Sequence, residues 1–131
     1  MKLAILNSIR TNNFDDELVM QKITDMWKEA SKDLAQHETN TYGVYYDYES
    51  DYTGDYSLSV AIEGEKEPCV TIANDQKYEA FTVDTSDEQG ILKMWSEIWD
   101  KEKAGKLQRA YTIDFEKYHP NGTIEIYIAV K

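Results

Sequence analysis

The chain contains a single cysteine, two histidines and two prolines among its 131 residues. The lone Cys69 excludes an intrachain disulfide framework. His37 and His119 do not have the spacing of metal ligands. The sequence also lacks the G-x-S-x-G, P-loop and G-x-G-x-x-G motifs. We therefore expect no metal and no cofactor, and no motif assigns a catalytic residue.

Long hydrophobic runs are missing as well. No stretch approaches the ~18 apolar residues that indicate a membrane span. The apolar stretch within residues 1–6 is too short for a signal peptide and is followed by no cleavage site. These features predict a cytoplasmic protein without membrane contact.

Positive charge is scarce, because 14 Lys and Arg face 25 Asp and Glu, giving a net charge of −11. A nucleic-acid-binding surface needs clustered basic residues that neutralise phosphates. The basic residues here are scattered among more numerous acids, so we expect no direct binding of DNA or RNA. The acidity favours a cationic ligand or a basic protein partner.

The sequence does contain an internal repeat. The pattern I-x-x-M-W-x-E begins at Ile23 and again at Ile91, 68 positions later. Asp47 and Asp114 begin a second pair of similar segments. A chain of this length fits one domain. We therefore predict a single domain, residues 1–131, built from two similar halves at about 1–64 and 77–131, with a groove where they meet.

Hydrophobic periodicity predicts the order strand, helix, strand, strand in each half. Residues 15–17 place acids at the start of the first helix, and Ser86 with Gln89 forms a capping box before the second. Gly105 suits the position after the second helix. The expected strands are 2–10, 42–48, 56–62, 70–72, 78–83, 109–115 and 124–130, and the helices end near 36 and 104.

These elements predict an α+β fold. Short turns between successive strands favour an antiparallel sheet with pseudo-twofold symmetry. Both helices need an apolar surface for their hydrophobic stripes, so we expect them on one sheet face with a groove between them. Such an interface is a favoured place for a ligand.

Aromatic and acidic residues are the strongest candidates for binding. The chain has ten tyrosines, three tryptophans and 25 acidic residues. Aromatic faces and a carboxylate in a partly dry pocket recognise organic cations. The side chains that we expect to converge are Glu116, Trp95, Trp99, Tyr111, Tyr118 and Tyr46.

Simpler interpretations stay open for two of these residues. Trp95 shares a helical stripe with Ile91 and Ile98, and such stripes usually form core. Glu116 directly follows the expected strand 109–115, and a carboxylate at the end of a strand is commonly just exposed to solvent. Strand parity places Glu116 on the face opposite Phe115, so it reaches the groove only if a bulge or turn reorients it.

Several segments occur in the order typical of a known family. They are the start of the chain around 8–13, the helix containing Met26 and Trp27, and the segments 42–45, 77–81, 91–99, 109–118 and 125–131. Together they resemble the GyrI-like, or AraC-type, effector-binding domain, and most closely its stand-alone integron-associated branch. The resemblance covers nearly the whole chain.

The resemblance implies a duplicated strand–helix–strand–strand fold with a central ligand groove. It implies binding of lipophilic, often cationic, small molecules by an acidic residue and aromatics. The D-F-E-x-Y motif of the family matches Asp114, Phe115, Glu116 and Tyr118, with Glu116 as the acidic residue. Some relatives are fused to DNA-binding units, for which this chain has no room, so a regulatory role would need a partner.

Three functional hypotheses remain. The first is a small-molecule effector-binding protein linked to transcriptional regulation or to drug and toxin sensing. The second is a hydrolase of strained genotoxins that uses Glu116, because some relatives of the family hydrolyse such compounds. The third is an acidic protein-interaction module such as a gyrase inhibitor. The first is the leading interpretation, with a small molecule as partner and no enzymatic activity.

Overall fold

The structure, a computed structural model, describes residues 1–34, 39–51 and 53–131. Its two helices are α1 (Val19–Leu34) and α2 (Gly90–Lys103). Its strands are β1 (Lys2–Thr11), β2 (Thr41–Tyr46), β3 (Tyr56–Glu63), β4 (Cys69–Thr71), β5 (Lys77–Thr82), β6 (Asp114–Tyr118) and β7 (Ile124–Val130). The sequence-based end of the first helix, near residue 36, lies outside the described residues.

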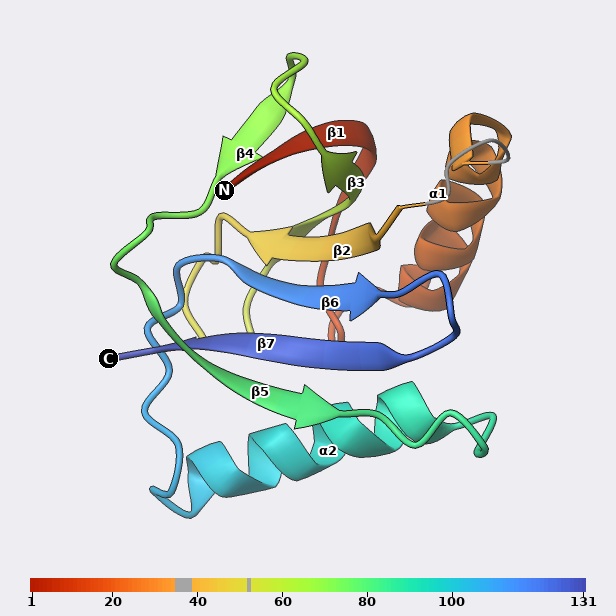
Figure 1. Cartoon of the computed structure of the whole chain (residues 1–131). Coiled ribbons are helices and arrows are strands. Elements are labelled where there is room, and N and C mark those ends of the chain that lie inside the picture. The colour runs from red at the N-terminus through yellow and green to blue at the C-terminus, as the bar shows by residue number, and fades with distance from the viewer. Residues whose placement is uncertain (35–38, 52) are drawn as a thin grey trace.

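All seven strands form one curled antiparallel sheet in the order β4-β1-β3-β2-β6-β7-β5 (Figure 1). The first half contributes β1, β3 and β2, and the second half contributes β5, β7 and β6. The two halves meet where β2 pairs with β6. Each half has the order strand, helix, strand, strand, so the predicted α+β fold is confirmed.

One row of residues crosses the middle of the sheet and defines its helix-covered face. The row passes from β3 to β5 through Val60, Gly43, Glu116, Ile126 and Phe81, which are Cα partners in neighbouring strands. Partners in a sheet point to the same side. The side chains of this row therefore lie on one face.

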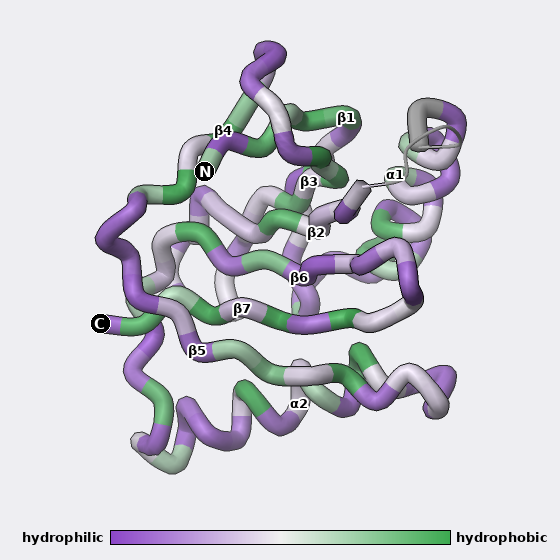
Figure 2. The backbone as a smooth tube through the Cα atoms, viewed as in Figure 1, coloured by the Kyte–Doolittle hydropathy of each residue, from purple (hydrophilic) through white to green (hydrophobic). Residues whose placement is uncertain are grey.

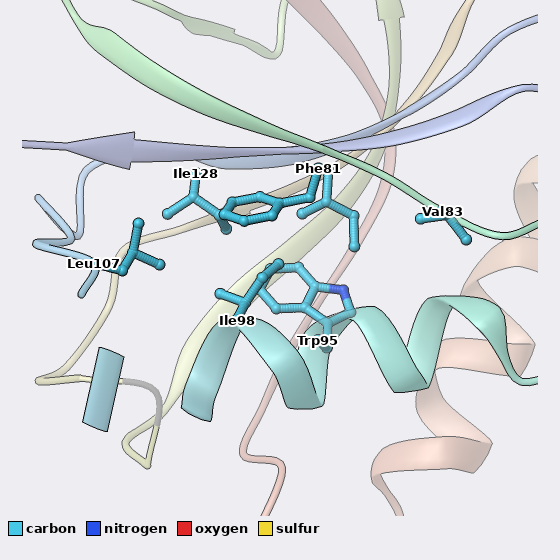
Figure 3. Packing of buried hydrophobic residues seen from close by; sticks show 7 residues of the cluster. Phe81, Val83, Trp95, Ile98, Leu107 and Ile128 are labelled. Atoms are coloured by element: carbon cyan, nitrogen blue, oxygen red, sulfur yellow. The ribbon is translucent and has the colours of Figure 1, made fainter. Parts of the chain in front are cut away.

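Both helices pack on that face. From α1, Met26 and Ala30 contact buried residues of β3. From α2, Trp95 and Ile98 project toward the sheet and pack against a cluster of Phe81, Val83, Leu107, Ile126 and Ile128 (Figure 3). The helices thus cover the two ends of the sheet, and its centre, where β2 meets β6, lies between them.

The opposite sheet face has its own core. Tyr42, Val44 and Phe115 are buried there together with Leu3 and Ala61. Along β7, hydrophobic residues alternate with more polar ones, as is typical of a strand whose two faces have different surroundings (Figure 2). Both faces of the sheet bury side chains. A shift of a strand's pairing register by one residue would therefore move its side chains from each face to the other.

The predicted helix starts are both early. α1 begins at Val19 and has no acid in its first turn, since Asp16 lies before it and accepts a bond from the backbone N–H of Leu18 at 2.9 Å. α2 begins at Gly90, and the capping box is absent because the side chain of Gln89 makes no cap bond. In the turns before the helices, carboxylates accept backbone N–H groups, so each helix begins a few residues later than predicted.

The end of α2 follows the prediction. Gly105 has φ of 74°, which suits glycine, and its N–H donates to the carbonyl of Glu102. The N–H of Lys106 reaches back to the carbonyl of Lys101. These two bonds form a Schellman motif and satisfy the last carbonyls of the helix.

The expected strand 109–115 is wrong. The regular strand β6 begins only at Asp114, and Tyr111 adopts φ of 55°. The Asp114 carboxylate accepts the backbone N–H of Ala129 at 2.7 Å, which anchors the chain where it enters the sheet. Glu116 is therefore in the middle of a strand rather than at its end, and it needs no bulge to face the helices.

Truncation of Ile98 tests the helix-to-sheet packing. Ile98 is fully buried under the sheet, so we expect Ile98→Ala to lower the free energy of unfolding by about 2–5 kcal/mol through lost burial and a cavity. Urea unfolding followed by circular dichroism measures this change. Glu97→Ala, on the exposed side of the same helix, is the control and should change stability by less than about 0.5 kcal/mol. Equal effects in the two variants would contradict this packing.

Candidate functional site

A pocket of about 500 Å³ lies over the helix-covered face of the sheet, with walls from both helices. Its apolar lining comes from Val19, Met20 and Ile23 of α1 and from Ile91 and Leu92 of α2. Its aromatic lining is Trp27, Tyr45, Tyr48, Tyr56, Trp95, Trp99 and Tyr118, and its remaining lining residues are Asn13, Glu88, Arg109 and Glu116. The size and the apolar character suit a small organic ligand.

Glu116 places a carboxylate in the wall of this pocket. The residue is only 4% exposed. Its Oε2 accepts hydrogen bonds from the Trp95 indole N–H at 2.7 Å and from the Tyr45 hydroxyl at 2.8 Å. Its Oε1 accepts one from the Tyr118 hydroxyl at 2.7 Å. All three donors are neutral, and no ion pair of Glu116 is found among the described residues.

Gly43 makes room for this carboxylate. It is the β2 partner of Glu116, and a Cβ atom built on it would lie 2.9 Å from Glu116 Oε1 and 3.4 Å from a ring carbon of Trp27. Any other residue would push the carboxylate or the indole aside. The glycine in the central row therefore positions both groups.

The tyrosines around Glu116 stay protonated. Burial raises the pKa of Tyr45 well above its ordinary value, and the nearby Glu116 charge raises it further. The same two causes, burial first, raise the pKa of Tyr118. Both hydroxyls are therefore lasting donors to the carboxylate at neutral pH.

The two repeated tryptophans lie on opposite walls of the pocket. Trp27 of α1 meets Tyr118 edge to face, with ring centroids 5.1 Å apart, and Trp95 of α2 meets Tyr45 in the same way at 5.0 Å. Each of these two tyrosines donates to Glu116. The aromatic walls and the carboxylate thus form one connected structure.

A second charged group borders the pocket at Arg109. Its side chain is 2% exposed, and its Nη2 donates to Asp114 Oδ2 at 2.7 Å. The hydroxyl of Tyr48 donates to the same Asp114 oxygen. The guanidinium lies over the ring of Tyr111, with 4.4 Å between its Cζ and the ring centroid. Burial lowers the pKa of Arg109, but Asp114, Tyr48 and Tyr111 together raise it above its ordinary value, so the group is charged.

The structure brings four of the six sequence-predicted site residues together: Glu116, Trp95, Trp99 and Tyr118 all line the pocket. Tyr46 lies on the other sheet face, where its hydroxyl meets Ser59 at 2.7 Å. Tyr111 lies behind the pocket wall, against Arg109. The two tyrosines were misplaced because the sequence does not show which parity of β2 faces the helices, or that the chain is irregular before Asp114.

Sequence reasoning missed several residues of the site. Trp27 could have been found from the repeat, since it is the counterpart of Trp95. Tyr45 lies two residues after Gly43 in β2 and points to the same sheet face. It could have been found once the face of Gly43 was known. Asp114 was noted only as part of the D-F-E-x-Y motif and Arg109 gave no signal, because a buried ion pair depends on contacts that the local sequence does not show.

Among the described residues, no group of three or more His, Cys, Asp or Glu side chains could hold a metal ion. Within the same part of the chain, no helix is both long and apolar enough to cross a membrane.

The fold defines a class of protein, α+β proteins with a curled antiparallel sheet and two helices on one of its faces. The family model of the integron-associated effector binding proteins, Cass2, matches residues 3–130. The chain belongs to this family. It is similar to the integron cassette protein VCH_CASS2 from the mobile metagenome of Vibrio cholerae, with a TM-score of 0.79 and 28% sequence identity. The match covers 100% of this chain and 90% of that one, while comparison with curated proteins gives no match.

The bond between Trp95 and Glu116 can be tested without a ligand. A hydrogen bond to a carboxylate is stronger than one to an amide, so Glu116→Gln should move the indole N–H signal of Trp95 upfield. A ¹H–¹⁵N correlation spectrum resolves the three indole signals. Glu65→Gln, in the exposed loop after β3, should leave them in place. A stationary Trp95 signal in the Glu116 variant would refute this arrangement.

Proposed function

We propose that the protein binds a lipophilic organic cation in the pocket between α1 and α2. The observation that carries this proposal is the buried Glu116 carboxylate, which has three neutral donors and no described ion-pair partner. A buried charge is costly unless it is paired. A bound cation would supply the opposite charge that the described residues do not place beside Glu116.

The aromatic walls support the same ligand class. A cation over a Trp or Tyr ring gains about 0.5–2 kcal/mol from the ring quadrupole. Trp27 and Trp95 face the pocket from opposite sides, so a cation at Glu116 would lie near ring faces and edges of both walls. The apolar residues of the helices would cover the lipophilic part of the ligand.

A role in drug or toxin sensing would follow from such binding. The chain itself carries an excess of negative charge and no basic cluster. A link to transcription therefore requires a protein partner that reads the ligand-bound state. Hydrolysis and direct inhibition of an enzyme such as gyrase are the alternatives, and product analysis by mass spectrometry of each bound compound tests the first of these.

Glu116→Gln is the direct test of charge recognition, because glutamine keeps the shape and removes the charge. Methyltriphenylphosphonium is a cation, and triphenylphosphine oxide is a neutral molecule of similar shape. We expect Glu116→Gln to weaken binding of the cation by about 1–3 kcal/mol, or about 5- to 150-fold in Kd, and to affect the neutral molecule much less. Isothermal titration calorimetry measures both.

The control for this test is Glu65→Gln, which removes the same charge from an exposed loop. It should change neither affinity by more than about twofold, because Glu65 is exposed and is not part of the pocket lining, so its charge is screened by solvent and salt. Equal weakening of cation and neutral molecule by Glu116→Gln would show a structural rather than an electrostatic role. Loss of turnover with retained binding would favour the hydrolase.

Fluorescence locates the ligand within the pocket. All three tryptophans line it, so methyltriphenylphosphonium should quench their emission. Trp99 is a partly buried part of this lining, whereas Trp95 donates a hydrogen bond to Glu116, so Trp99→Phe is a milder change than replacing Trp95. We expect Trp99→Phe to reduce the quenched amplitude while the protein stays folded. Unchanged amplitude would place the ligand away from Trp99.

A further inference from the structure

Arg109 is the second buried charge at the pocket, and its hydrogen bonding is incomplete. Its Nη2 is bonded to Asp114, but neither Nε nor Nη1 has a hydrogen-bond acceptor among the described residues. Nη1 lies 3.5 Å from Glu102 Oε1, within ion-pair range but without the geometry of a hydrogen bond. Buried donors without acceptors are rare in folded proteins and cost free energy.

Arg109 lies in the wall of the pocket in which we propose that the ligand binds. The residue is 4% exposed and lines the same pocket as Glu116. The ring of Tyr111 holds one face of its guanidinium, and Asp114 fixes one end. The group is thus held in place at the pocket wall, with two donor nitrogens that have no acceptor among the described residues.

We propose that Arg109 is a second ligand anchor, and that the ligand carries a neutral hydrogen-bond acceptor, such as a carbonyl or ether oxygen, in addition to its cationic group. This inference rests on the proposed function, because it assigns the other end of the same ligand. Guanidinium donors in a fixed fork suit an oxygen acceptor, and the ligand oxygen would satisfy the two donors that have no acceptor in the described part of the chain.

The charges around Arg109 indicate a neutral acceptor rather than an anionic one. The guanidinium already faces the carboxylates of Asp114 and Glu102. With Glu116 nearby, the pocket has an excess of negative charge, so a carboxylate on the ligand would be repelled. A carbonyl or ether oxygen accepts the same bonds without that cost.

The sheet gives the spacing between the two anchors. Asp114 and Glu116 lie two residues apart on one face of β6, which corresponds to about 7 Å along a strand. Arg109 lies beyond Asp114, to which it is bonded. We expect the acceptor and the cationic centre of the ligand to be separated by roughly 7–10 Å.

A series of matched cations tests this inference. Each oxo ligand is a triphenylphosphonium with a methyl ketone at the end of an alkyl chain, and two to six methylene groups set the spacing. Each isostere has an isopropyl group in place of the methyl ketone. We expect one of the longer oxo ligands to bind roughly tenfold more tightly than its isostere, measured by calorimetry.

Arg109→Lys separates an anchor from a structural residue. Lysine keeps a positive charge beside Asp114 but lacks the fork of donors, so the ratio of the two affinities should fall to about one. In Glu116→Gln both affinities should fall while the ratio is retained. If Arg109→Lys does not fold, the wild-type protein still answers the question, because the Arg109 Nε–H signal should move with the oxo ligand and not with its isostere.

The outcomes distinguish the two proposals. Tight binding of all cations with equal affinity within every pair would overturn the role of Arg109 and leave the cation site intact. The same holds for a ratio that survives Arg109→Lys in a folded protein. Failure of every phosphonium to bind would overturn the cation site, and the inference about Arg109 with it.

Discussion

The burial of one carboxylate constrains the whole pocket. Glu116 lies in the central row of the sheet, where desolvation disfavours a charge, and three neutral donors offset part of that cost. These donors come from β2, α2 and β6, so the two halves must keep their relative placement for all three bonds to form. Gly43 completes the arrangement, because a larger residue would occupy the space of the carboxylate.

The two helices supply the walls of the pocket, and the strand pair where the two halves meet supplies the charge. The repeated pattern puts Ile23 and Trp27 on one wall and Ile91 and Trp95 on the other. At the junction of the halves, however, Glu116 faces Gly43 rather than a second carboxylate. Two carboxylates there would repel each other, whereas one acid and one glycine leave a single negative centre between two aromatic walls.

Much of the fold could be predicted from the sequence, because alternating and helical periodicities mark β3, β7 and the two helices, and the repeat fixes their order. Strand parity in β2 could not, and it decided the outcome for Tyr46, whereas the irregular chain before Asp114 decided the outcome for Tyr111. The start of β6 depends on Asp114 accepting the N–H of Ala129 and pairing with Arg109, contacts between distant segments that no local pattern encodes. Four pocket residues were found because composition and family resemblance pointed to aromatic rings around Glu116.

Under the proposed function, the pocket would accept ligands of different shape but would discriminate between them by charge. Its outer part is lined by Met20 and Leu92, which are 58% and 53% exposed and can adjust to ligands of different outline. Its inner part is held by hydrogen bonds to Glu116 and by the ion pair of Arg109, where small displacements would leave buried polar groups unpaired. Selectivity would therefore reside at the rigid inner end, in the placement of one cationic group and one acceptor, while the helices accommodate the rest of the molecule.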